Sequence, residues 1–519
     1  MNKISRVFII LFLLLIYILG SYFSFTTGIS HDQFHENYNV LLNIQTIKEL
    51  VNFGNSALLS NYQDKYMGIG FSFISYPIQI FFTSLIKSFF SLPSIGVHYL
   101  IKNFIIFNIF YFSAYLIYLI FIDLIKNKFA SFVAASLYLT YPVFFGHSLI
   151  NPKDIPFSVV WLLCTFVSFK IVKSYLRKSF FYYKDIILLS FFTAYLVSVR
   201  FAGLLILVQY FFLFIILINT EKIDFIKFIK SEFNKIILFI IIFIFLIIFF
   251  YPSIWTNPLD LYSGIKFSTK FYNDVCTFVF GKCLKASNLP PTYIPIWLIL
   301  KLPIIVLVGI LYLFFNDKKI LFNKINKIFL GTIICTIIFI YIFIILFNVR
   351  IYNEIRHLLF LINLFFIIGV ASLFYLNKKI FFISSMCSVL FFVIEMVYIH
   401  PYQYSWFNSP SRFLDLQKNF EVDYWGVSNR NLYNYLNKNE NLDRSTCVYG
   451  DGYIEIFLND FTCKKHFAEA SQAKRPFFAV QNARNNNRNL PDCLTLYEEK
   501  FRFLFYKKDL VVGKVIKCV

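Results

Sequence analysis

Apolar runs long enough to cross a membrane dominate this chain and limit what it can fold into. Of the 519 residues, 58% are hydrophobic and 70 are Phe, whereas apolar residues make up roughly half of an ordinary soluble domain. A helix of about 20 apolar residues spans the hydrocarbon core of a bilayer. We therefore expect an α-helical polytopic membrane protein.

The basic residues are distributed in a way that argues against a nucleic-acid partner. A formal net charge of +21 would suggest such a partner if the cations formed one patch on a soluble domain. Most of them lie instead in short loops between apolar runs. This is the positive-inside pattern, which orients membrane helices and implies no nucleic-acid partner.

Reading the apolar runs together with their flanking charges predicts about eleven spanning helices and a cytoplasmic N-terminus. The first run could be a cleaved signal peptide, but its length and the lack of a small-residue cleavage site favour a retained span. The predicted inner loops then collect basic residues, among them Lys126, Lys128, Lys173, Arg177, Lys178, Lys378 and Lys379. The expected spans are residues 6–24, 101–124, 129–147, 156–172, 185–199, 201–219, 236–252, 293–315, 328–347, 357–376 and 380–399.

This topology divides the chain into a transmembrane domain, residues 1–399, and a C-terminal domain, residues 400–519. Residues 24–99 form a long first outer segment, in which 40–53 looks amphipathic. The apolar stretch 67–90 could be a further span, but it would invert every later loop, so we expect a re-entrant or juxtamembrane helix. Residues 400–519 lose the apolar runs and predict a small α/β domain on the extracytoplasmic side.

Six of the nine cysteines fall in segments assigned to the outer side, which suits disulfides. Cys276 and Cys283 are the plausible local pair. The other four, in the C-terminal domain, allow three connectivities, and unpaired thiols are the alternative. No CxxC or His/Cys spacing indicates structural zinc.

The acidic and cationic side chains suited to chemistry lie in the predicted outer loops. Transfer of a sugar from a polyprenyl phosphate needs a carboxylate to accept the acceptor's proton and cations to stabilise the departing phosphate. Asp32 could be the base, while Lys153, Arg200 and Arg356 could hold the phosphate. Charges at the ends of spans are often merely solvated, and Asp154 could simply cap a helix, although Arg200 lies between two apolar runs with little loop to expose it.

The loops resemble those of the integral membrane glycosyltransferases related to protein O-mannosyltransferases and aminoarabinose transferases. Ile29-Ser-His-Asp32-Gln-Phe-His35-Glu36 resembles their acidic first-loop motif, and Phe145-Gly-His-Ser-Leu-Ile-Asn-Pro-Lys-Asp154-Ile-Pro156 their second outer-loop motif. Tyr352-Asn-Glu-Ile-Arg356-His357-Leu-Leu-Phe360 is similar to their late Arg-His turn. His400-Pro-Tyr-Gln-Tyr-Ser-Trp-Phe-Asn408 and Asp423-Tyr-Trp-Gly426 resemble a bacterial subgroup.

The resemblance implies a C-type glycosyltransferase fold in a bacterial inner membrane and a lipid-phosphate sugar donor, usually with inversion at the anomeric carbon. Asp32 would activate the acceptor, Asp154 would take the second acidic position, and Arg356 and His357 would act on the phosphate side. Gln33 departs from the family pattern, which commonly has Glu after the Asp, and Glu36 could compensate from one helical turn away. No cofactor is certain, and a divalent metal stays open.

The sequence thus predicts a glycosyltransferase that moves a sugar from a polyprenyl phosphate to a hydroxyl of a glycan, lipid or protein outside the inner membrane. A lipid or solute transporter, or flippase, is the main alternative, because transporters also use charges at membrane depth. A binding or assembly protein that works through the C-terminal domain is the second alternative.

Overall fold

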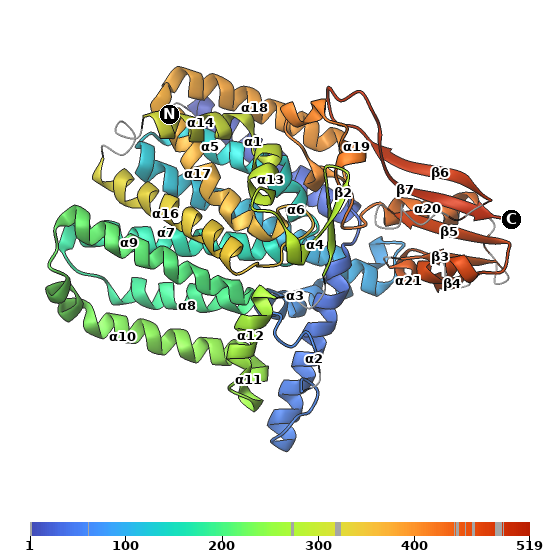
Figure 1. Ribbon diagram of the computed structural model, residues 1–519, viewed down its shortest axis with the longest axis horizontal. Coiled ribbons are helices and arrows are strands. Elements are labelled where there is room, and N and C mark those ends of the chain that lie inside the picture. The colour runs from blue at the N-terminus through green and yellow to red at the C-terminus, as the bar shows by residue number, and fades with distance from the viewer. Residues whose placement is uncertain are drawn as a thin grey trace.

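A helical bundle forms most of the molecule, and a small β-sheet with its helices lies at one end of it (Figure 1). The N-terminus lies at the opposite end of the bundle from this sheet. The computed structural model describes residues 3–60, 62–270, 274–316, 323–440, 442, 446–451, 453–458, 462–482, 490 and 492–519.

In the part of the chain that the structure describes, eight helices are long and apolar enough to cross a membrane. They coincide with eight of the predicted spans. Short 3-10 turns, η2 (Phe201–Leu205) and η4 (Arg356–Leu358), lead into two of them. The eight are α1 (Lys3–Thr26), α4 (Ser94–Ile125), α7 (Asp154–Lys178), α9 (Ile206–Glu221), α10 (Phe225–Phe250), α16 (Lys324–Leu346), α17 (Leu359–Leu376) and α18 (Lys378–Tyr398).

The other three predicted spans are shorter or broken, so the count of eleven is not confirmed. Residues 129–147 become α5 (Lys128–Thr140) and α6 (Pro142–Ser148), which meet at an angle of 57°. Residues 293–315 become α13 (Tyr293–Lys301) and α14 (Ile304–Phe315). Pro142 and Pro303 stand at these two breaks, where proline removes a backbone donor and disfavours helix in the residue before it. The third, α8 (Tyr183–Val199), is one continuous helix of 17 residues.

The segment 24–99, which the sequence predicts on the outer side, is mostly helical. Helix α2 (His31–Phe53) begins well before the amphipathic stretch expected at 40–53, so the His31–Glu36 cluster occupies the first turns of a helix. Helix α3 (Gly70–Ile86) and the 3-10 turn η1 (Lys87–Phe89) cover the predicted re-entrant stretch. Helix α3 has 17 residues and is not among the eight membrane-length helices.

A further segment between the long helices follows α10 and lies beside α2 (Figure 1). It contains α11 (Pro252–Thr256), α12 (Asp260–Thr269) and a hairpin of β1 (Cys276–Val279) and β2 (Lys282–Lys285), followed by η3 (Ala286–Asn288). The predicted Cys276–Cys283 disulfide is present and closes this hairpin.

The C-terminal part forms the predicted α/β unit around a five-stranded sheet of order β4-β3-β5-β7-β6. Strands β3, β4 and β5 run parallel, and β7 pairs antiparallel with β5 and β6. Of the three possible pairings, the structure has Cys447–Cys463, which joins β3 to β4, and Cys493–Cys518, which joins β6 to β7. The strands are β3 (Cys447–Gly450), β4 (Cys463–His466), β5 (Phe477–Asn482), β6 (Cys493–Phe501) and β7 (Leu510–Cys518); the helices are η5 (Gln403–Ser405), η6 (Pro410–Phe413), α19 (Leu416–Asn419), α20 (Asn429–Asn439), α21 (Ile454–Phe457) and η7 (Phe467–Gln472).

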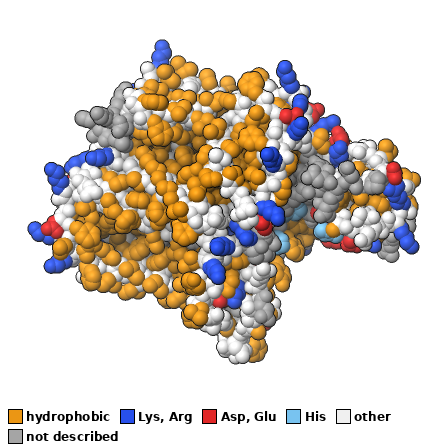
Figure 2. Space-filling view, viewed as in Figure 1, with side chains coloured by type: hydrophobic (Ala, Val, Ile, Leu, Met, Phe, Trp, Pro, Cys, Tyr) orange, Lys and Arg blue, Asp and Glu red, His pale blue; other side chains and the backbone are white. Residues whose placement is uncertain are grey.

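The bundle carries its hydrophobic side chains on the outside as well as in the core. Helix α17 is buried along nearly its whole length, whereas α10 exposes Ile241 and Phe245 by 60% and 67%. Figure 2 shows hydrophobic side chains over most of the bundle on this face, with Lys and Arg toward its ends. Because an apolar surface of this extent is unfavourable in water, the structure supports a membrane protein.

Candidate functional site

The first turn of α2 meets the turn before α17 at an ion pair. Arg356 Nη1 lies 2.9 Å from Asp32 Oδ2, although the two residues are 324 positions apart. The Asp32 side chain is 32% exposed and that of Arg356 only 3%. The Arg356 guanidinium lies over the Trp425 ring, 4.5 Å from its centroid, and over Tyr352 at 5.0 Å, so aromatic rings fix its orientation.

The turn that presents Arg356 has an unusual backbone. Asn353 and Glu354 both adopt the left-handed conformation, with φ of 54° and 62°, which is uncommon for residues other than glycine. The Glu354 carboxylate is buried 2.7 Å from the ammonium of Lys301 on α13. Burial raises the pKa of Glu354 to about 7, while Lys301 acts in the opposite direction. The Lys301 contact anchors this turn to the bundle.

A second cluster forms where α7 begins. The Asn151 side-chain oxygen accepts hydrogen bonds from the backbone N–H groups of Lys153 and Asp154, at 3.2 and 2.9 Å, and the Asn151 amide donates to Asp154 Oδ2 at 2.9 Å. Asp154 also pairs with Arg200, the residue that follows α8. The N-cap residue of α7 is Lys153, so the predicted capping role of Asp154 is wrong; Asn151 accepts from the N–H groups at the helix start, and Asp154 holds Arg200.

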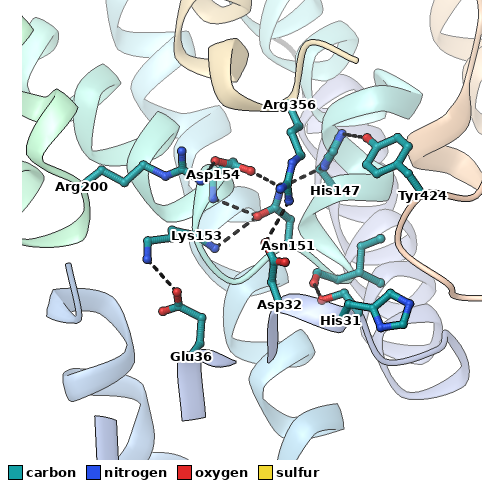
Figure 3. A network of polar contacts seen from close by, with 12 residues as sticks. His31, Asp32, Glu36, His147, Asn151, Lys153, Asp154, Arg200, Arg356 and Tyr424 are labelled. Atoms are coloured by element: carbon teal, nitrogen blue, oxygen red, sulfur yellow. Dashed lines mark hydrogen bonds and ion pairs between the residues drawn. The ribbon is translucent and has the colours of Figure 1, made fainter. Parts of the chain in front are cut away.

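A third cluster surrounds Glu36, one turn beyond Asp32 on α2. The Lys153 ammonium lies 2.7 Å from Glu36 Oε1, and the Ser72 hydroxyl donates to Glu36 Oε2 at 3.1 Å. Lys102 of α4, which is 2% exposed, donates to Ser72 at 3.0 Å. One buried carboxylate thus lies close to two buried ammonium groups. Figure 3 shows how the three clusters face one another across the ends of α2 and α7.

These residues border a cavity of about 920 Å³. Six of the seven predicted site residues line it: Asp32, Glu36, Lys153, Arg200, Arg356 and His357. Asp154 does not line it and is buried behind Arg200. Other walls of the same cavity are apolar, with Phe157, Leu204, Leu205, Ile340, Phe343, Ile344 and Phe360 among their residues.

This arrangement can bind an amphiphilic anion. Lys153, Arg200 and Arg356 provide cations at one part of the cavity, and their carboxylate partners hold them in place. Guanidinium groups suit phosphate oxygens because they can donate two parallel hydrogen bonds. The apolar walls suit a hydrocarbon chain, and Asp32 is the most exposed carboxylate of the three ion pairs.

Sequence reasoning missed three contributors to the site. Lys102 looked like the flank of an apolar run, since nothing in its local sequence marks it as buried. Trp425 was noted only within a motif, and its contact with Arg356 depends on tertiary packing. Tyr453, whose hydroxyl reaches the start of α2, carried no local signal.

Among the described residues, no group of three or more His, Cys, Asp or Glu side chains is arranged to hold a metal ion. The sequence left a divalent metal open, and this observation does not change that.

No protein-family model and no curated protein matches this chain. The relation to C-type glycosyltransferases accordingly stays a prediction from the loop motifs.

Proposed function

We propose that this protein is a membrane glycosyltransferase that moves a sugar from a polyprenyl-phosphate donor to an acceptor hydroxyl. The observation that carries the proposal is one cavity that combines a partly exposed carboxylate, three cations and apolar walls. A polyprenyl-phosphate sugar has the matching parts, namely a sugar at which reaction occurs, a phosphate and a hydrocarbon tail.

In the proposed reaction the acceptor oxygen attacks the anomeric carbon, and the bond from that carbon to the phosphate oxygen breaks. Asp32 takes the acceptor's proton, and polyprenyl phosphate leaves with both bonding electrons. Arg200, Arg356 and Lys153 stabilise the negative charge of the leaving group. Donor phosphate would compete with Asp32 for Arg356, which frees the carboxylate to bind the acceptor hydroxyl.

The proposed sidedness follows from the basic loops. With Lys and Arg of the short loops in the cytoplasm, the site and the C-terminal sheet face the outer side of a bacterial inner membrane. The charges of the site lie at the ends of α2, α7 and α8, whereas transporters more often place their sites on broken helices near the midplane. This favours transfer over transport.

The test is transfer of labelled sugar from a polyprenyl-phosphate donor by the purified protein in lipid vesicles. Asp32→Asn should reduce transfer by at least a hundredfold, since general-base catalysis contributes about 10²–10⁴-fold. Asp185→Asn is the matched control. Asp185 is buried in the first turn of α8, where it pairs with Lys170 of α7. It lies about 20 Å along α8 from Arg200.

Full transfer by Asp32→Asn would remove Asp32 from the mechanism. If the wild-type protein transfers nothing but moves labelled lipid between leaflets, the flippase alternative is correct.

A further inference from the structure

We infer that Tyr453 of the C-terminal unit positions Asp32 for reaction by inserting its hydroxyl into the first turn of α2. This inference rests on the proposed function, because it gives the C-terminal unit a part in the same transfer. The residues involved lie more than 400 positions apart in the sequence.

The geometry at the start of α2 carries the inference. An α-helix normally closes its turns with hydrogen bonds from each N–H to the carbonyl four residues earlier. Here the Phe34 N–H donates to Tyr453 Oη at 2.8 Å, and Tyr453 Oη donates to the Ser30 carbonyl at 2.5 Å. The hydroxyl therefore lies between the two backbone groups that would otherwise bond to each other, and the turn that it bridges contains Asp32.

The usual means of starting this helix is not used. Ser30 stands at the N-cap position but makes no side-chain capping bond; its hydroxyl donates instead to the Ile150 carbonyl at 2.7 Å. Ser30 thus ties α2 to the loop before α7, and Tyr453 supplies a partner for the helix N–H group. Unpaired N–H groups at a helix start need such a partner.

Close packing holds Tyr453 in this place. Its backbone is left-handed, with φ of 65°, an uncommon conformation for a bulky residue and one that often accompanies function. Its ring centroid lies 5.6 Å from that of Tyr99. It lies 6.4 Å from the ring centroid of His31, the neighbour of Asp32, in a stacked arrangement.

Neighbouring contacts leave little room for the start of α2 to move. A Cβ on Gly426 would lie 2.6 Å from His31 Nε2, and one on Gly28 would lie 2.4 Å from the Val427 carbonyl oxygen. Arg430 Nη1 donates to the carbonyls of Phe25 and Thr27 at 2.8 and 2.5 Å. A shift of about 1 Å in a reacting group can cost a hundredfold in rate, so a hydroxyl that fixes this turn affects catalysis without touching substrate.

Tyr453→Phe removes the hydroxyl and keeps the ring. We expect kcat for sugar transfer to fall about tenfold with KM for the donor unchanged, since Lys153, Arg200 and Arg356 are untouched. Amide hydrogen exchange at residues 31–36, measured in lipid nanodiscs, should become faster. Tyr435→Phe is the matched control, because Tyr435 is half-buried in the same unit and its hydroxyl donates to the Leu496 carbonyl of β6 at 3.4 Å; it should leave kcat and this exchange unchanged.

Unchanged kcat in Tyr453→Phe overturns the positioning role, even if exchange becomes faster. Unchanged exchange overturns the inserted hydroxyl itself. An equal loss of kcat in Tyr435→Phe would assign the effect to general stability and would also overturn the inference. If the wild-type protein transfers no sugar, the proposed function fails and the positioning role fails with it, whereas hydrogen exchange still reports separately on the hydroxyl contact.

Discussion

Glu36 has an electrostatic role that its place in the sequence does not reveal. Its carboxylate contacts Lys153 directly and Lys102 through the Ser72 hydroxyl. Both lysines are at least 90% buried. Removal of the Glu36 carboxylate takes this partner from both buried lysines. Removal of Lys153 leaves Glu36 in contact with Ser72 and, through it, with Lys102.

Glu36→Gln should therefore lower the free energy of unfolding by about 3–5 kcal/mol, as expected for a broken buried ion pair. Lys153→Met should cost less, about 2 kcal/mol, the scale of one charged hydrogen bond. Thermal unfolding in one fixed detergent compares the two variants. A second change, Lys102→Met, should restore part of the loss in Glu36→Gln, and equal losses in the two single variants would contradict this account.

Asp154 and Asp32 should give different kinetic signatures. Asp154 lies outside the cavity and holds Arg200, so Asp154→Asn should raise KM for the donor about tenfold, equivalent to about 1.4 kcal/mol of binding, with a smaller change in kcat. Asp32→Asn should lower kcat instead. Initial rates over a range of donor concentrations separate the two effects. A loss confined to kcat in Asp154→Asn would give Asp154 a direct part in the chemistry.

At the scale of elements, a close approach between the backbones of α6 and η5 fixes the position of the loop that precedes α7. Gly146 in α6 packs against η5, and a Cβ there would lie 2.0 Å from the Tyr404 backbone nitrogen. Helix α6 leads directly into the loop that carries Asn151 and Lys153. The sequence suggested only a span at 129–147, because a close packing partner 258 positions away leaves no local pattern.

Gly146→Ala should destabilise the protein by about 3 kcal/mol, the upper part of the range for overpacking, because backbone atoms cannot turn aside as a side chain can. Gly331→Ala in α16 is the control. Its Cβ would meet only Ile216 Cδ1 at 3.5 Å, an ordinary contact, and alanine favours helix by up to about 1 kcal/mol. The melting temperature should fall in Gly146→Ala and rise in Gly331→Ala. An unchanged melting temperature in Gly146→Ala would show that α6 can shift away from η5.

At the scale of the whole molecule, the C-terminal residues are continuous with the bundle. One hydrophobic cluster includes α4 and α17 residues together with Trp406, Trp425 and Phe503. The predicted boundary at residue 399 is thus crossed by shared core packing, and the site itself uses Trp425 and Tyr453.

Removing the Cys447–Cys463 disulfide should consequently affect transfer as well as stability. The pair closes a loop over 16 positions, for which about 3 kcal/mol is expected. Cys447→Ser with Cys463→Ser should lower the melting temperature of the C-terminal unit and reduce transfer at temperatures where that unit unfolds. Circular dichroism and proteolysis follow the unfolding of the C-terminal unit. Transfer that persists after the unit has unfolded would show that the bundle works alone.

The sequence by itself determined the helical character, eight helices long and apolar enough to cross a membrane, the α/β C-terminal unit and the Cys276–Cys283 pair, because hydropathy and local spacing are properties of neighbouring residues. It also predicted Asp32, Arg200 and Arg356, which line one cavity, since charges beside apolar runs stand out. Tertiary structure alone decided that Asp32 pairs with Arg356, that Asp154 lies outside the cavity and holds Arg200 at its wall, and that Lys102, Trp425 and Tyr453 support the residues that line it. These contacts join residues up to about 420 positions apart, and only packing of the folded chain brings such distant groups together.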